Sequence, residues 1–129
     1  MAKTQWLDRR IAFPGPYLSL CLSEAEFIRA LKDCGIKESI AWIKTDYAQA
    51  TAHYLHNTVG DLVCIVCLRD WENRNPVEIA GLLIHEAVHV WQEYAERIGE
   101  RYPAREQEAY AIQAISQELL AEFSRRMAD

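Results

Sequence analysis

Several features are scarce or missing in the 129-residue sequence, and each absence excludes a class of protein. No apolar run reaches the length that crosses a bilayer, and the first ten residues contain no apolar signal core. The chain has 14 Lys and Arg against 19 Asp and Glu, its net charge is −5, and its basic residues form no cluster along the sequence. We therefore expect a cytoplasmic protein that acts without a membrane and without nucleic acid.

Glycine and proline are also few, with five and four copies, and the chain contains no repeat or low-complexity tract. Half of the residues are hydrophobic, which is enough for one core, so residues 1–129 are expected to form a single domain. The four cysteines lie among apolar residues. Cys64 and Cys67 have the spacing of a metal knuckle, but no second ligand pair follows, so all four are expected to be buried free thiols.

Local signals predict helices and strands in alternation. A capping box that begins at Ser23, followed by apolar residues at helical spacing, predicts a helix over residues 24–34. Four segments read as short strands: residues 17–22, 39–45, 48–56 and 62–68. The last of them is apolar almost throughout and is expected at the centre of the sheet, whereas residues 48–56 mix polar and apolar side chains as an edge strand does.

Two longer helices are predicted in the second half of the chain. Asn75 as cap and Pro76 at the first helical position predict a helix from residue 76 to about residue 98 that stops at Gly99. Between residues 79 and 91 it is apolar nearly all round, so its middle is predicted to be buried. Glycine at position 81 makes the helix about 1 kcal/mol less stable than alanine would. The expected reason for a glycine there is that another backbone packs closely against it. The last helix is predicted from about residue 103 to about residue 126.

The first of these long helices contains the pattern His85-Glu86-Ala87-Val88-His89. Residues four apart lie about 40° apart around a helix axis, so both imidazoles point the same way and can bind one metal ion. Glu86 lies about 60° from His89, close enough to act on a metal-bound water without being a ligand. The pattern HExxH is typical of zinc hydrolases. The competing interpretation is a purely structural role for these side chains in the core.

A third ligand from the last helix must be acidic, because no histidine follows His89. Glu106 and Glu108 are the choices, and they point about 200° apart on that helix, so only one can face the metal. Glu108 lies nearer the centre of the apolar stripe. Glu106 is followed three residues later by Ala109, which would let the two helices approach.

The HEAVH motif followed by a glutamate-bearing helix resembles the gluzincins, which are HExxH metallopeptidases with a glutamate on a later helix as third ligand. The segment from Ala50 to about Leu120 is also similar to small phage and prophage HExxH proteins. The resemblance implies an α+β fold of the minimal zincin type. In that fold a small mixed or antiparallel sheet packs on the buried HExxH helix and on a C-terminal helix that bears the glutamate.

The resemblance also implies a zinc site. In several gluzincin families the ligand glutamate begins the pattern Glu-x-x-Ala-Asp or Glu-x-x-Ala-Asn, which maps onto Glu106, with Tyr110 in place of the final polar residue. The implied ligands are therefore His85, His89 and Glu106, with Glu108 as the alternative third ligand.

The function that the resemblance implies is zinc-dependent cleavage of a peptide bond by a metal-activated water, with Glu86 as general base. The substrate would be a peptide or protein docked as an added strand, and residues 48–56 are the candidate edge. Five side chains are open candidates for the oxyanion donor: His53, Tyr54, His56, Tyr102 and Tyr110. The alternative function is a catalytically silent binding or assembly module, associated with phage, that keeps the zincin fold.

Overall fold

The computed structural model describes residues 3–7 and 15–128. These residues form an α+β fold of three α-helices, a three-stranded mixed sheet and one short 3-10 turn, so the predicted fold class is confirmed at this level. The elements follow one another as β1 (Tyr17–Cys21), α1 (Glu24–Asp33), β2 (Ala50–His56), β3 (Leu62–Leu68), η1 (Trp71–Asn73), α2 (Pro76–Arg97) and α3 (Arg105–Ala128). The predicted single domain, residues 1–129, includes residues 1–2, 8–14 and 129, which lie outside the described part.

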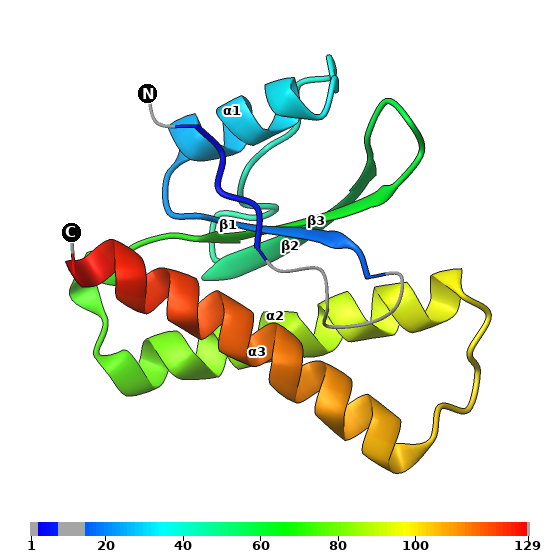
Figure 1. Ribbon diagram of the computed structural model, residues 1–129. Helices are drawn as coiled ribbons and strands as arrows, with labels where there is room; N and C mark the ends of the chain where they lie inside the picture. The colour runs from blue at the N-terminus through cyan, green and yellow to red at the C-terminus, as the bar shows by residue number, and fades with distance from the viewer. Residues whose placement is uncertain (1–2, 8–14, 129) are drawn as a thin grey trace.

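The sheet has the strand order β1-β3-β2, so β3 is central and β2 is an edge strand, as predicted. β2 runs antiparallel to β3 through the hairpin, and β1 runs parallel to β3. Helices α2 and α3 cover one face of the sheet and α1 covers the other (Figure 1). Because both faces are covered, every residue of β3 after Leu62 is buried.

The core is split into two clusters by the sheet. On the side of α2 and α3, β-strand residues such as Leu18, Leu20 and Val66 pack with Leu83, Trp91 and Leu119. On the side of α1 the cluster is smaller and contains Phe27, Leu31, Val63, Ile65 and Cys67. All four cysteines are free and buried, which confirms that prediction. Burial raises the pKa of the Cys64 thiol to about 12, which keeps it protonated.

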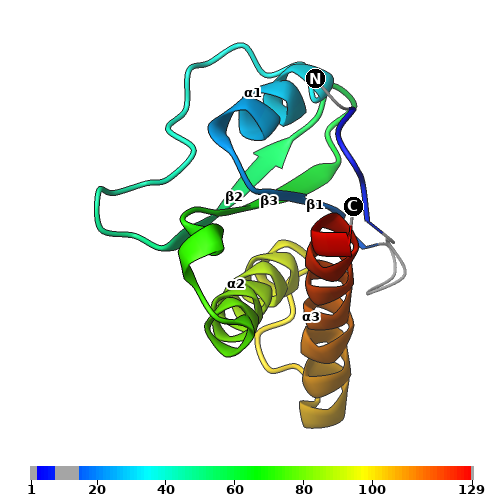
Figure 2. The same ribbon diagram turned by 90° about the vertical axis from the view of Figure 1, so that its left-hand side faces the viewer.

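The strand predicted over residues 39–45 is wrong, because that part of the long loop between α1 and β2 is irregular (Figure 2). The backbone amide of Lys44 donates to Thr51 Oγ1 at 3.1 Å, and His53 Nε2 lies 2.9 Å from the carbonyl oxygen of Trp42. The loop is thus attached to side chains of β2 and not to its backbone, so no ladder of backbone hydrogen bonds forms.

The predicted capping signals are present at both helices that they concern. At α2, Asn75 Oδ1 accepts from the Glu78 amide at 2.9 Å, and the Glu78 carboxylate accepts from the Asn75 amide at 3.3 Å. At α1, the Ser23 hydroxyl accepts from the Glu26 amide at 3.2 Å. The Glu26 carboxylate, however, accepts from the amide of Leu22 and not from that of Ser23. Helix α2 ends before Gly99, which has a φ of +75°.

Helix α2 is not buried all round, which corrects the prediction for its middle. α2 contacts β2 and α3, and the remaining side of the helix faces solvent. On that side lie Gly81, His85, His89 and Ile84, the last with 42% of its surface exposed. A Cβ atom built on Gly81 has no neighbouring atom within 4 Å, so the expected close approach of another backbone is also wrong. None of the helices in the described part combines the length and hydrophobicity of a membrane span.

Candidate metal centre and adjoining pocket

The two histidines of the motif form a pair on the exposed side of α2. Their Nε2 atoms lie 3.2 Å apart, and their rings meet edge to face with centroids 4.8 Å apart. Two nitrogens that bind one tetrahedral zinc ion at about 2.05 Å would be about 3.3 Å apart. The spacing of His85 and His89 therefore fits two corners of a tetrahedral zinc site.

Gln92 fixes the chemical state of one of these rings. Its Oε1 atom lies 2.9 Å from His89 Nδ1, one helical turn further on. An amide oxygen can only accept, so Nδ1 is the donor in this contact, and in the neutral ring Nε2 then carries the lone pair that a metal needs. Histidines that bind metals usually have such an acceptor at the second nitrogen. The sequence analysis missed Gln92, although a residue three positions after His89 lies on the same side of a helix.

Glu86 is the buried ionisable residue of the motif, with 6% of its surface exposed. Burial raises the pKa of its carboxyl group, and the nearby positive charges of the imidazoles and of Lys44 oppose part of that rise. A carboxylate whose pKa is raised takes up a proton more readily, which is what a general base requires.

A shallow pocket of about 320 Å³ lies between α2 and β2. Glu86 and His89 form its wall on the side of α2. The rest of its lining comes from β2 and the loop before it: Lys44, Thr45, Ala48, Ala50, Thr51, Ala52 and Tyr54. Several of these side chains are alanines, which leave room beside the carboxylate. The pocket is therefore bounded by an edge strand, a buried carboxylate and one imidazole of the pair.

Tyr54 differs from the other candidate oxyanion donors because it lines this pocket. Burial raises the pKa of its phenol, which therefore stays protonated and able to donate a hydrogen bond. His53 is buried against Phe27, with ring centroids 4.5 Å apart, on the opposite face of the sheet. His56 contacts the Arg97 guanidinium at the exposed end of β2.

Tyr102 and Tyr110 are the remaining two candidates. They are 90% and 65% exposed, respectively, and neither lines the pocket.

The structure does not bring either predicted third ligand to the imidazole pair. Glu108 Oε2 accepts a hydrogen bond from Trp91 Nε1 at 2.8 Å. Trp91 lies about 160° around α2 from His89, so this carboxylate lies on the other side of that helix. Glu106 is exposed on α3. Within residues 3–7 and 15–128, no three His, Cys, Asp or Glu side chains form a group that could hold a metal ion. The identity of a third ligand stays a prediction.

Glu108 also lines a cavity of about 540 Å³ between the end of α2 and the start of α3. Gln92 borders the same cavity. Of the two glutamates, Glu108 is thus the one that lies at the interface of the two helices and lines the same cavity as Gln92.

Comparison with known proteins gives no assignment, because no protein-family model, no curated protein and no solved structure matches the chain.

Proposed function

We propose that this protein is a zinc-dependent hydrolase with a minimal zincin-like fold, and that it cleaves peptide bonds. The observation that carries the proposal is the pair of Nε2 atoms 3.2 Å apart, with Gln92 bound to the second nitrogen of one ring. The same spacing also allows one imidazole to donate a hydrogen bond to the other, so the proposal rests on the pair together with Glu86 and Gln92. The buried carboxylate of Glu86 next to the pair adds the group that hydrolysis needs.

Four residues in or beside the pocket have roles in this proposal. His85 and His89 would hold the zinc ion, which when bound supplies Lewis acidity and a more acidic water. Glu86 accepts a proton from the attacking water and delivers it to the leaving amine. Tyr54 donates a hydrogen bond to the oxygen that gains negative charge, because it is the donor candidate in the same pocket. A peptide would bind along the edge strand β2.

Glu108 is a better third ligand than Glu106 on geometric grounds. Glu106 points to solvent from α3, whereas Glu108 is half-buried at the interface with α2 and shares a cavity with Gln92. A ligand role requires the Glu108 carboxylate to leave Trp91 and to reach the side of α2 that carries the imidazoles, which is a change in how α3 packs on α2. We therefore keep both glutamates as candidates for the test and expect Glu108 to matter more, which reverses the preference that the family resemblance implies.

The second candidate function is a zincin-fold binding or assembly module without catalysis. The observation that favours it is that no group of three potential ligands forms within the described residues. In such a module Glu86 has no catalytic task, so its replacement would leave the biological function intact.

Metal analysis of the full-length protein tests the zinc site. We expect about one zinc ion per chain in the wild type and its loss in His85→Ala. The matched variants Glu106→Gln and Glu108→Gln decide the third ligand, because each removes one charge from the same helix. Glu96→Gln, an exposed position on α2, serves as the control. A wild type that binds no zinc would refute the zinc site.

Cleavage is tested separately, with a peptide library and mass spectrometry of the products. The Glu86→Gln variant is expected to keep its zinc and to lose all product formation. Zinc retention together with unchanged biological function in this variant would favour the module over the enzyme.

A further inference from the structure

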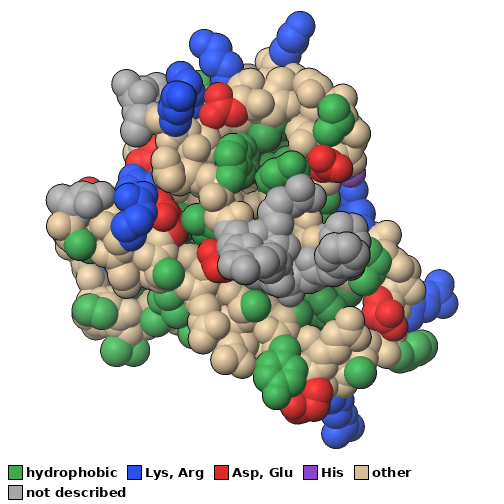
Figure 3. Space-filling model, in the orientation of Figure 1, with side chains coloured by type: hydrophobic (Ala, Val, Ile, Leu, Met, Phe, Trp, Pro, Cys, Tyr) green, Lys and Arg blue, Asp and Glu red, His purple; other side chains and the backbone are tan. Residues whose placement is uncertain are grey.

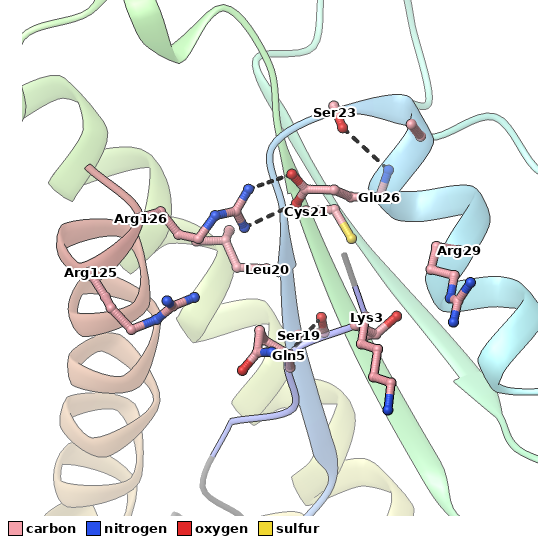
Figure 4. Close-up of a pocket in the computed structure, with 12 residues that line it drawn as sticks. Lys3, Gln5, Ser19, Leu20, Cys21, Ser23, Glu26, Arg29, Arg125 and Arg126 are labelled. Carbon is pink, nitrogen blue, oxygen red and sulfur yellow. Dashed lines mark hydrogen bonds and ion pairs between the residues drawn. The ribbon is translucent and has the colours of Figure 1, made fainter. Parts of the chain in front are cut away.

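A second cavity, of about 410 Å³, lies at the edge strand β1, between the start of α1 and the end of α3 (Figure 4). The pocket beside Glu86 lies at β2, the opposite edge of the sheet, and the two share no residue. The N-terminal segment borders this cavity, because Ser19 Oγ donates to the Gln5 carbonyl at 3.2 Å. The Leu7 amide, in turn, donates to the Leu18 carbonyl at 2.8 Å.

Basic side chains dominate the lining of this cavity. Four of them border it, from three separate parts of the chain: Lys3, Arg29, Arg125 and Arg126. Glu26 is the acidic residue among the lining side chains. In the space-filling view, Lys and Arg side chains gather on this side of the molecule, with acidic side chains between them (Figure 3). A basic lining is notable in a chain with a net charge of −5.

Ion pairs hold two of the guanidinium groups in position. Arg126 binds the Glu26 carboxylate through both terminal nitrogens, which joins the end of α3 to the first turn of α1. Arg125 donates to Glu122 through Nε at 2.9 Å and Nη2 at 2.7 Å. A guanidinium has five N–H donors, and a bidentate carboxylate engages two of them. These contacts therefore orient both Arg side chains, and the bidentate pair with Glu26 leaves further N–H groups on Arg126.

The second observation concerns polar atoms without a hydrogen bond. Three buried side-chain atoms of the described residues have no hydrogen-bond partner, and two of them, Thr4 Oγ1 and Arg29 Nε, belong to residues that line this cavity. Arg29 Nε forms an ion pair with Asp33 at 3.3 Å, so of these two atoms it is Thr4 Oγ1 that is left unsatisfied. An unsatisfied buried polar atom costs about 1–3 kcal/mol, and native proteins usually provide it with a water or ion.

We propose that this cavity binds a small phosphorylated molecule. Arginine forks match the oxygens of a phosphate group, and the unpartnered hydroxyl of Thr4 can donate to one of them. Leu20, Ala25 and Cys21 add an apolar part to the lining, which suits the organic portion of such a ligand. This site is independent of the zinc centre, since it uses other residues at the other edge of the sheet.

The test uses inorganic pyrophosphate and succinate as probes, added to the full-length protein and followed by calorimetry and by amide NMR shifts. We expect pyrophosphate to bind at millimolar concentration or below and to shift the amides of Ser19, Ser23 and Ala25. Weaker binding of succinate is expected, because a phosphate group offers more oxygens to the arginines. Equal binding of both probes would overturn the preference for phosphate, and no binding of pyrophosphate would overturn the site.

Three variants distinguish pyrophosphate binding in the cavity from binding that depends only on the surface charge of the protein. The double variant Lys3→Gln, Arg29→Gln should weaken pyrophosphate binding by about tenfold or more. Lys32→Gln, which removes a charge from α1 outside the cavity, should bind as the wild type does. Thr4→Val should weaken binding without lowering the thermal stability, because it removes an unpartnered hydroxyl. An equal loss of binding in Lys32→Gln would refute a specific site.

Discussion

Replacing Gly81 by alanine is expected to stabilise the protein by about 1 kcal/mol. Gly81 lies in the interior of α2, where glycine is less favourable than alanine by roughly that amount. No atom lies within 4 Å of the added Cβ, so the gain is not offset by a clash. For a chain of 129 residues the entropy of unfolding is about 0.27 kcal/mol/K, so the melting temperature should rise by about 4 °C.

Thermal and urea unfolding of the zinc-free protein would measure this change. Gly99→Ala is the matched control, because Gly99 has a φ of +75° and alanine there should destabilise by about 1–2 kcal/mol. A lower stability of Gly81→Ala would refute the reasoning and would mean that another backbone packs against this turn. Gly81 lies one turn before His85 on the same side of α2. If the proposed peptide cleavage is unchanged in Gly81→Ala, the substrate does not contact this turn of the helix.

Three further predictions concern the metal centre. Burial raises the pKa of Glu86, so its contribution to stability is lost as pH rises through that pKa. The zinc-free Glu86→Gln protein should therefore gain stability over the wild type as the pH rises above about 4 in urea unfolding, and a constant difference would contradict this. Gln92→Leu should weaken zinc binding about 10- to 100-fold in a chelator competition, with Gln117→Leu on α3 unchanged. Trp91→Phe removes the donor to Glu108 and should destabilise the zinc-free protein by about 1–3 kcal/mol, measured by urea unfolding, with no change if that bond is absent in solution.

The sequence predicted those elements whose signals are local. The capping box of α2 involves residues three positions apart, and its hydrogen bonds form as expected. The bounds of β3, residues 62–68, are also as predicted, because an apolar run between turn signals is typical of a central strand. The hydrophobic character of a segment thus identified the element, and turn residues identified its ends.

The errors came from features that depend on which neighbours an element acquires. Residues 39–45 have β-prone side chains, but Lys44 finds a partner in the Thr51 hydroxyl and the backbone stays irregular. The apolar middle of α2 predicted burial on all sides, yet among the described elements it packs mainly on the sheet and α3, and Ile84 is exposed. Apolar periodicity shows which residues can be buried and does not show how many sides of a helix are covered.

The basic cavity could not be predicted from the sequence, because its residues are far apart in the chain. Lys3, Arg29 and Arg125 come together only when the N-terminal segment, α1 and α3 meet at the edge of β1. No run of basic residues marks them in the sequence. The same reasoning explains why the third ligand stayed open, since the direction of Glu106 and Glu108 depends on how α3 packs on α2.

The energies of two interactions decide where the Glu108 carboxylate lies when zinc is present. Its hydrogen bond from Trp91 stabilises the fold by about 1–3 kcal/mol, because the acceptor is charged. Binding of a structural zinc ion contributes about 10–16 kcal/mol over four ligands, or about 2.5–4 kcal/mol per ligand, so the gain of one ligand would be comparable with the loss of that hydrogen bond. Since Glu108 is on α3 and the imidazoles are on α2, zinc binding through Glu108 would also couple the metal to the packing of these two helices. Trp91 is buried with 2% exposure, so its fluorescence should change on zinc addition in the wild type and not in Glu108→Gln.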